Sequence, residues 1–237
     1  MNKTSRMAQC LIGFMAMCGV AALVLGLFRT RPVHGLPFFT LLMIGIVSSR
    51  LKVKLPGLNG NMSMNLPFIL LATLQLSLFE ALIVALSSIL AQCYPAKRGN
   101  STGVQALFNL STIAVAVAVA ALVAHSRIGA RSEMLALVAA GAAFFVLQTV
   151  PVAAILALTE GGPVFRIWRS IVQLSFPYFV LSAGVTAIAE TLSQVWDWQI
   201  PVLVMLTMYG VYRSYVTYFG HMTSQGPAVA FAKAAGR

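Results

Sequence analysis

Long apolar runs alternate with short links along the whole chain, and the links carry most of the basic residues. A run of about 20 apolar residues is long enough to cross a bilayer as a helix. The pattern therefore predicts an all-α, polytopic integral membrane helix bundle over residues 1–220, followed by a short cytoplasmic tail at 221–237. The runs that we interpret as spans are 8–28, 36–53, 64–78, 81–94, 104–125, 134–158, 174–192 and 200–219.

The two central runs, 64–78 and 81–94, allow two interpretations because both are short. Apolar segments below about 17 residues are ambiguous between a full crossing and a re-entrant segment. These runs either cross the membrane twice or form one re-entrant hairpin that bends at Glu80. The loop at 54–61 in front of them holds a Pro-Gly and an Asn-Gly dipeptide, which are typical of turns. We therefore predict six to eight transmembrane helices.

The composition agrees with a membrane protein. The chain is 59% hydrophobic and only 9% charged, with a mean hydropathy of +0.87, whereas soluble domains carry roughly 25% charged residues. The formal net charge of +11 is spread over the links in groups of one to three basic residues, without a nucleic-acid-binding module. We therefore expect the lipid bilayer as a partner and no nucleic acid, and we relate the basic residues to membrane orientation.

The positions of Lys and Arg predict this orientation, because their excess belongs on the cytoplasmic side. With eight crossings and a cytoplasmic N-terminus, twelve of the 16 basic residues lie on the cytoplasmic side and four lie on the other. Six crossings are also an even number, so both termini are predicted to be cytoplasmic in either case. The twelve are Lys3, Arg6, Arg50, Lys52, Lys54, Lys97, Arg98, Arg166, Arg169, Arg213, Lys233 and Arg237.

Small residues at helical spacing predict close packing between helices. They are Cys18, Ala22 and Gly26 on the first run, and Ala81, Ala85, Ser88 and Gln92 on the fourth. The three cysteines form no CxxC pair, and we interpret them as packing residues. Residues 164–173 are predicted to form a short interfacial helix, and the tryptophans at 196–198 an aromatic belt at the membrane interface.

Two polar faces within the predicted spans supply candidate ligand-binding residues. Gln105, Asn109 and Thr112 share one face of the run 104–125. Tyr178 and Ser182 share a face of the run 174–192. Such faces can line an amphipathic pocket, but hydrogen bonds between helices explain them equally well.

Glu80 is the sixth candidate residue, since it is the only acid between residues 36 and 96. An acid inside a membrane can mark a proton or ligand site. Its position at the predicted bend favours a solvated residue in an external loop instead.

The sequence contains no acyl-transfer, P-loop or zinc motif. We therefore predict that the protein is not an enzyme, and we expect no cofactor and no metal.

Two stretches of the sequence resemble a known group of membrane regions. The first is SRLKVKLPGLNGNMSMNLPFILLATLQLSLFEALIVA followed by LFNLSTIAVA, and the second is FPYFVLSAGVTAI followed by LVMLTMYGVYRSYVTYFGHM. They resemble the N-terminal multi-helix membrane region of bacterial signalling proteins whose cytoplasmic part is a GGDEF or HD-type cyclic-di-GMP module or a histidine kinase. In that family the last helix leads into an output domain, whereas this sequence stops at Arg237.

This resemblance implies a sensory or ligand-binding module in the bacterial cytoplasmic membrane. Without its own output domain, the chain would act through a cytoplasmic or membrane partner, and a homo-oligomer stays open. The central region also looks like the substrate-binding S component of energy-coupling-factor vitamin transporters. The alternative function is therefore a subunit that takes up a small molecule together with an energising module.

Overall fold

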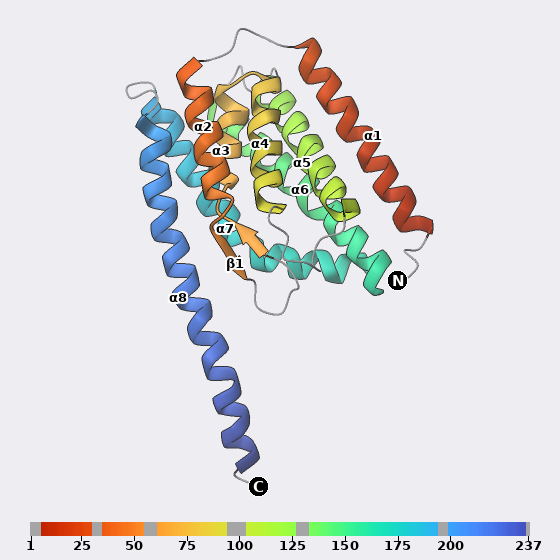
Figure 1. The fold of residues 1–237 in the computed structure, drawn as a ribbon, viewed down its shortest axis with the longest axis vertical. Helices are drawn as coiled ribbons and strands as arrows, with labels where there is room; N and C mark the ends of the chain where they lie inside the picture. Colours follow the sequence, from red (N-terminus) through yellow and green to blue (C-terminus); the bar gives the residue numbers. More distant parts are fainter. Residues whose placement is uncertain are drawn as a thin grey trace.

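The computed structural model describes residues 6–29, 35–54, 61–93, 103–126, 133–193 and 199–235. Within these ranges the chain forms a helix bundle with one small two-stranded sheet (Figure 1), so the prediction of an all-α architecture is confirmed. The elements are α1 (Arg6–Phe28), α2 (Gly35–Ser48), β1 (Lys52–Lys54), β2 (Asn61–Ser63), α3 (Leu66–Gln75), α4 (Leu78–Cys93), α5 (Gly103–Ala124), α6 (Glu133–Glu160), α7 (Val164–Ser193) and α8 (Gln199–Ala235).

Successive helices run in opposite directions, as the predicted serial crossings require. The upper end of the bundle in Figure 1 holds the α3–α4 turn, and the lower end holds the β1–β2 hairpin. Contacts of Ser63 with Tyr178 and of Gln75 with Glu190 show that α3 and α7 run parallel. Helix α1 rises from the lower end and α8 descends towards it. The cytoplasmic location of that end stays a prediction.

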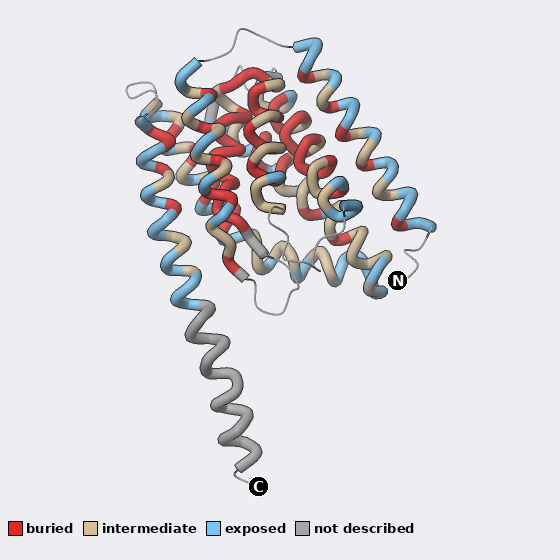
Figure 2. The backbone as a smooth tube through the Cα atoms, in the orientation of Figure 1, coloured by how far each residue is buried: buried red, intermediate tan, exposed pale blue. Residues whose placement is uncertain are grey.

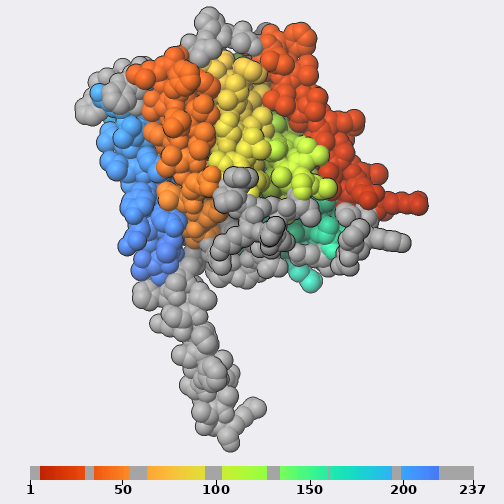
Figure 3. All heavy atoms as spheres, in the orientation of Figure 1, coloured from red at the N-terminus to blue at the C-terminus, as the bar shows by residue number. Residues whose placement is uncertain are grey.

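Burial divides the helices into a central group and a peripheral group. Figure 2 shows the buried residues concentrated on α3, α4 and α5, and eight of the ten residues of α3 are buried. Large apolar side chains on the outer helix α1 are exposed, among them Phe14 at 57% and Met17 at 68%. Figure 3 shows α8, α2, α4, α5 and α1 side by side across one face. An apolar outer surface of this kind suits contact with lipid.

Four helices of the described chain are long and apolar enough to cross a membrane: α1, α5, α6 over Met134–Thr159, and α7. The helices α2, α3 and α4 are apolar but shorter. Length and composition thus make these four helices candidates for crossing a membrane. The count of six to eight stays a prediction.

The turn between α3 and α4 corrects the predicted position of Glu80. The chain turns at Leu76 and Ser77, so Glu80 lies in the first turn of α4 and is only 2% exposed. The backbone N–H and the hydroxyl of Ser77 donate to Glu80 Oε2 over 2.9 and 2.6 Å. This is a capping box, in which a Ser and a Glu three residues later satisfy the start of a helix. The prediction that Glu80 is a solvated loop residue was wrong.

The β1–β2 hairpin was not predicted. The run 36–53 was expected to be one span, but α2 ends at Ser48 and the chain then forms β1. The strands pair antiparallel, with Val53 opposite Met62. Val53 is 2% exposed, and Lys52 Nζ donates to the carbonyl of Gln92 at the C-terminal end of α4. The hairpin therefore packs into the lower end of the bundle and closes it.

The last two helices are longer than predicted. Residues 164–173 belong to one continuous helix α7, with Pro177 inside it, so the expected break before residue 174 is absent. Membrane helices tolerate an internal proline when neighbouring groups satisfy the freed carbonyl. Helix α8 continues past Gly220 to Ala235. The predicted aromatic belt at 196–198 lies outside the described residues.

Small residues bring helices into close contact, mostly as predicted. Ala22 and Gly26 of α1 are buried, but Gly19 takes the place expected for Cys18, which is half-buried. A Cβ added to Gly19 would lie 3.0 Å from the backbone Cα of Ser111 on α5. Backbone atoms cannot move aside as a side chain can, so glycine permits the contact between α1 and α5.

Replacing Gly19 with alanine is expected to lower the free energy of unfolding by about 1–3 kcal/mol, because the added methyl overpacks the α1–α5 contact. Gly13 on the same helix has no atom within 4 Å of an added Cβ. The matched change Gly13→Ala is expected to leave stability unchanged or raise it by up to about 1 kcal/mol. Denaturant titration in mixed micelles measures both. Equal losses in the two variants would contradict the proposed contact.

Candidate functional site

A cavity of about 250 Å³ lies in the lower half of the bundle, where β2 and the helices α3 to α7 meet. Its wall is apolar, with Phe144, Phe145 and Phe179 among its members, and polar groups interrupt it at several points. None of the described residues that line it is charged. The polar lining residues are Ser63, Asn65, Gln92, Gln148, Thr149, Ser175 and Tyr178.

The short length of α3 explains why the cavity opens there. Ten residues of helix span about 15 Å, which is half of a hydrocarbon layer of about 30 Å. The chain between β2 and α3 is therefore non-helical and needs other partners for its backbone. The Tyr178 hydroxyl donates to the Ser63 carbonyl over 3.0 Å, and Met64 N–H donates to the Leu51 carbonyl over 3.1 Å. Non-helical backbone inside a membrane protein is found where it is buried or lines a cavity.

Asn65 is the N-cap residue of α3, but its side chain makes no capping hydrogen bond. An N-cap Asn ordinarily accepts from the second or third N–H of its helix. Here the second position is Pro67, which has no N–H. The Asn65 Oδ1 instead accepts from the Ser63 hydroxyl over 2.8 Å. Asn65 is only 5% exposed, and its Nδ2 atom is buried without a hydrogen-bond partner among the described residues.

The other side of the cavity is built by α6 and α7. The rings of Phe145 and Phe179 lie 4.7 Å apart and tie these helices together. Trp168 Nε1 donates to Thr149 Oγ1 over 3.1 Å, which places the indole of Trp168 next to a lining residue. Aromatic residues of α6 and α7 therefore line the same cavity as Ser63 and Asn65.

The structure brings one of the six predicted site residues to this cavity, namely Tyr178. Gln105 is exposed at the start of α5, and Asn109 is half-buried. Thr112 and Ser182 are buried in the bundle, and Glu80 caps α4 at the upper end. These five residues do not line the cavity, so their proposed ligand contacts stay predictions.

The sequence analysis did not identify Ser63, Asn65 and Gln148 as site residues. Two signals were available. Gln148 is a polar residue inside the apolar run 134–158, and Asn65-Leu66-Pro67 combines an N-cap residue with a proline at the second helical position. Neither signal reveals that Asn65 and Gln148, 83 positions apart, line the same cavity, because that depends on how the helices pack.

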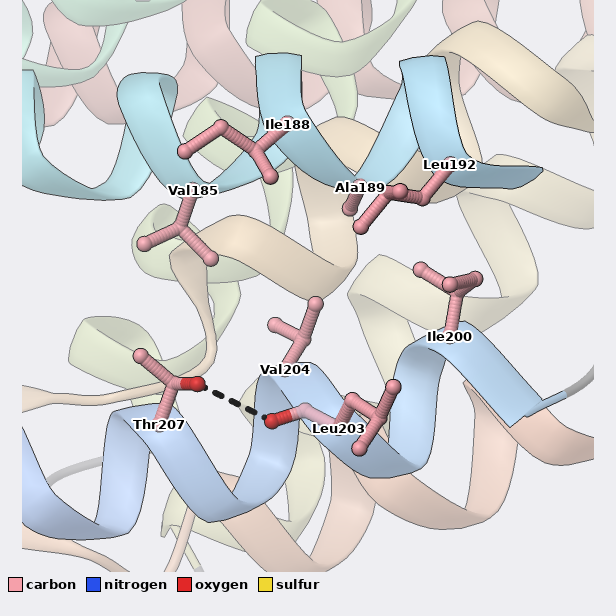
Figure 4. A pocket seen from close by; sticks show the side chains of 8 residues that line it. All are labelled: Val185, Ile188, Ala189, Leu192, Ile200, Leu203, Val204 and Thr207. Carbon is pink, nitrogen blue, oxygen red and sulfur yellow. Dashed lines mark hydrogen bonds between the residues drawn. The ribbon is translucent and has the colours of Figure 1, made fainter. Parts of the chain in front are cut away.

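A second, smaller hollow of about 150 Å³ lies between α7 and α8 (Figure 4). Its lining is apolar apart from Thr207, and the Thr207 hydroxyl already donates to the Leu203 carbonyl over 3.1 Å. Its one polar lining side chain is thus already hydrogen-bonded within α8. No group of three or more metal-binding side chains is found in the part of the chain that the structure describes.

Comparison with known proteins gives one match. The model of the MASE9 family matches residues 14–216, which is most of the chain and includes every element around the cavity. No curated protein and no solved structure matches.

Proposed function

Because the chain belongs to the MASE9 family of membrane-associated sensory domains, we propose that it detects a ligand inside its helix bundle. It would do so in the bacterial cytoplasmic membrane, with both termini in the cytoplasm, and without catalysing a reaction. The observation that carries this proposal is the uncharged, amphipathic cavity beneath α3. Ligand sites typically combine an apolar wall with a few polar groups that fix orientation.

The hairpin offers a route from the cavity to the last helix. Ser63 ends β2 and accepts the hydrogen bond from Tyr178 in the cavity wall. The paired strand β1 contacts α8, and Val211 and Tyr212 of α8 pack against the core that includes Val53. A ligand that displaces Ser63 or Tyr178 would therefore shift the hairpin against α8.

Helix α8 is suited to carry such a shift out of the membrane. Its 37 residues span about 56 Å, compared with about 30 Å for the hydrocarbon layer. The resemblance to signalling proteins suggests that the receiving partner is a cytoplasmic output module of the GGDEF, HD or histidine-kinase kind. Ligand occupancy would then change the population of two positions of α8.

The experiment is a fusion of a GGDEF domain after Arg237, with cyclic di-GMP measured in cells. Tyr178→Phe removes the hydroxyl that bonds Ser63 and is expected to change the output at least about threefold, since even 0.65 kcal/mol shifts a two-state ratio by that factor. Tyr209→Phe is the matched control, because Tyr209 is 49% exposed on α8 and is not part of the cavity. Equal output from wild type and Tyr178→Phe would contradict the sensory route.

The same strains distinguish the sensory function from the alternative function, which is an uptake subunit of a vitamin-type transporter. Co-purification of the chain with an ATPase module from detergent, together with an output that is indifferent to Tyr178→Phe, would replace the sensory proposal by transport.

A further inference from the structure

We infer that the first half of α7, residues 164–176, binds the phosphate groups of anionic phospholipids through Arg166 and Arg169. This inference goes beyond the sensory function and does not depend on it. The lipid would bind on the outer side of a helix whose inner side forms part of the cavity wall.

This part of α7 lies across the end of the bundle. In Figure 1 it is the turquoise helix that runs across the lower end, and α7 rises along the bundle only after it. Pro177 follows directly, and a proline inside a helix is a common cause of such a change in direction. Helix α1 starts at the same end, and its 23 residues span about 35 Å, close to the roughly 30 Å of the hydrocarbon layer. The first half of α7 therefore lies at the level of the lipid headgroups.

The outer side of this segment combines arginines with aromatic rings. None of the residues 164–176 is buried. Arg166 and Arg169 are exposed and lie three positions apart, so they share one face of the helix. Phe165 is 69% exposed and Phe176 is 51% exposed. A bilayer accounts for both features, because the rings can enter the acyl region while the guanidinium groups meet the phosphates.

Both guanidinium groups are available for an anion. Neither the Arg166 nor the Arg169 side chain forms an ion pair or a hydrogen bond with another residue that the structure describes. A guanidinium group can donate two parallel N–H bonds to the oxygens of one phosphate. Two such groups on one helix face are therefore matched to the phosphates of the lipid surface.

The charge at the lower end favours an anionic lipid over a zwitterionic one. Of the acidic residues in the described ranges, only Glu160, at the end of α6, lies at this end. Each basic residue near an anionic bilayer surface adds to the attraction. Besides the two arginines of α7, the basic residues of the elements at this end are Arg6, Arg50 and Lys52.

The inner side of the same segment connects the lipid surface to the cavity. Ile171 and Ser175 line the cavity, and Trp168 Nε1 donates to the lining residue Thr149 over 3.1 Å. The rings of Phe165 and Trp168 lie 6.1 Å apart. A lipid on the outer side would thus contact a helix that forms the cavity wall, and the fluorescence of Trp168 can report its binding.

The experiment uses the full chain in lipid nanodiscs that contain phosphatidylglycerol and phosphatidylcholine. Trp196 and Trp198 are replaced by phenylalanine, so that Trp168 is the remaining tryptophan. Bromine atoms on a lipid acyl chain quench tryptophan fluorescence on contact, and either the anionic or the zwitterionic lipid is brominated in otherwise identical discs. We expect stronger quenching by brominated phosphatidylglycerol, and the ratio of the two effects measures the lipid preference at α7.

Arg166→Gln and Arg169→Gln are each expected to lower this preference about fivefold, which is the effect of one basic residue near an anionic surface. The double variant is expected to bring the ratio close to one. Changing both arginines to lysine keeps the charges and is expected to retain most of the preference. Arg213→Gln is the matched control, because Arg213 is exposed on α8. Screening confines the effect of an exposed charge to its surroundings, so this variant is expected to leave the preference nearly unchanged.

Equal quenching by the two lipids in the parent protein would overturn the inference. An equal loss of preference in Arg213→Gln and Arg166→Gln would also overturn it, since it would indicate the field of the whole end instead of a site on α7. Displacement of phosphatidylglycerol by glycerol phosphate in the buffer would assign the arginines to a soluble phosphate compound. If the lipid preference is found but Tyr178→Phe leaves the cyclic di-GMP output unchanged, the sensory function fails and the lipid site stands.

Discussion

Replacing Phe144 with alanine is expected to lower the free energy of unfolding by roughly 3–5 kcal/mol, the range measured for buried Phe-to-Ala changes. Phe144 is fully buried and forms part of the cavity wall between α5 and α7. Removing its ring would join a new void to the existing cavity. Its neighbours cannot collapse into this space without moving whole helices, so their lost dispersion contacts are not regained.

Titration of the micelle-bound protein with SDS, followed by circular dichroism, measures this loss. Phe14→Ala is the matched control, because the Phe14 ring on α1 is 57% exposed at the outer surface and its removal opens no internal void. We expect a change below about 1 kcal/mol for this variant. A similar loss in both variants would show that Phe144 does not pack in the interior.

Replacing Glu80 with alanine is expected to cost roughly 2–3 kcal/mol, since the buried Ser77 N–H and hydroxyl lose their shared carboxylate acceptor. The same change removes the capping box that starts α4 and fixes its angle to α3. The melting temperature in detergent reports the effect. Glu80→Gln keeps one acceptor oxygen at the same place, so it is expected to lose less than half as much. Full stability of Glu80→Ala would mean that the carboxylate is dispensable for the α3–α4 turn.

The helical framework could be predicted because the length of an apolar run is a local property of the sequence. Residues 8–28 and 104–125 form α1 and α5 within two residues of the predicted ends. The short runs on either side of Glu80 were correctly separated into two helices, but their turn was placed too late. The Ser77-Leu78-Phe79-Glu80 spacing is a capping-box signature, and it would have placed both the turn and the buried carboxylate.

The hairpin and the cavity were harder to predict for physical reasons. Lys52-Val53-Lys54 alternates polar and apolar side chains as a strand does, but three residues are too few to outweigh the apolar run before them. The cavity depends on contacts such as Ser63 with Tyr178, which lie 115 positions apart. Tyr178 was predicted from a helical face alone. Predicting that Asn65 lines the cavity would also have required knowing that α3 begins midway through the bundle.

The shortness of α3 and α4 also bears on how the protein is made. The ten residues of α3 fall well below the length at which a helix inserts into a bilayer by itself. The capped turn at Ser77 allows α3 and α4 to enter the membrane together as one helical hairpin. Tyr178 is synthesised long after that step, so the carbonyl of Ser63 must wait for its hydroxyl until α7 has been inserted. The cavity is consequently a late product of biogenesis, and a chain interrupted before α7 would insert most of its helices without completing the cavity wall.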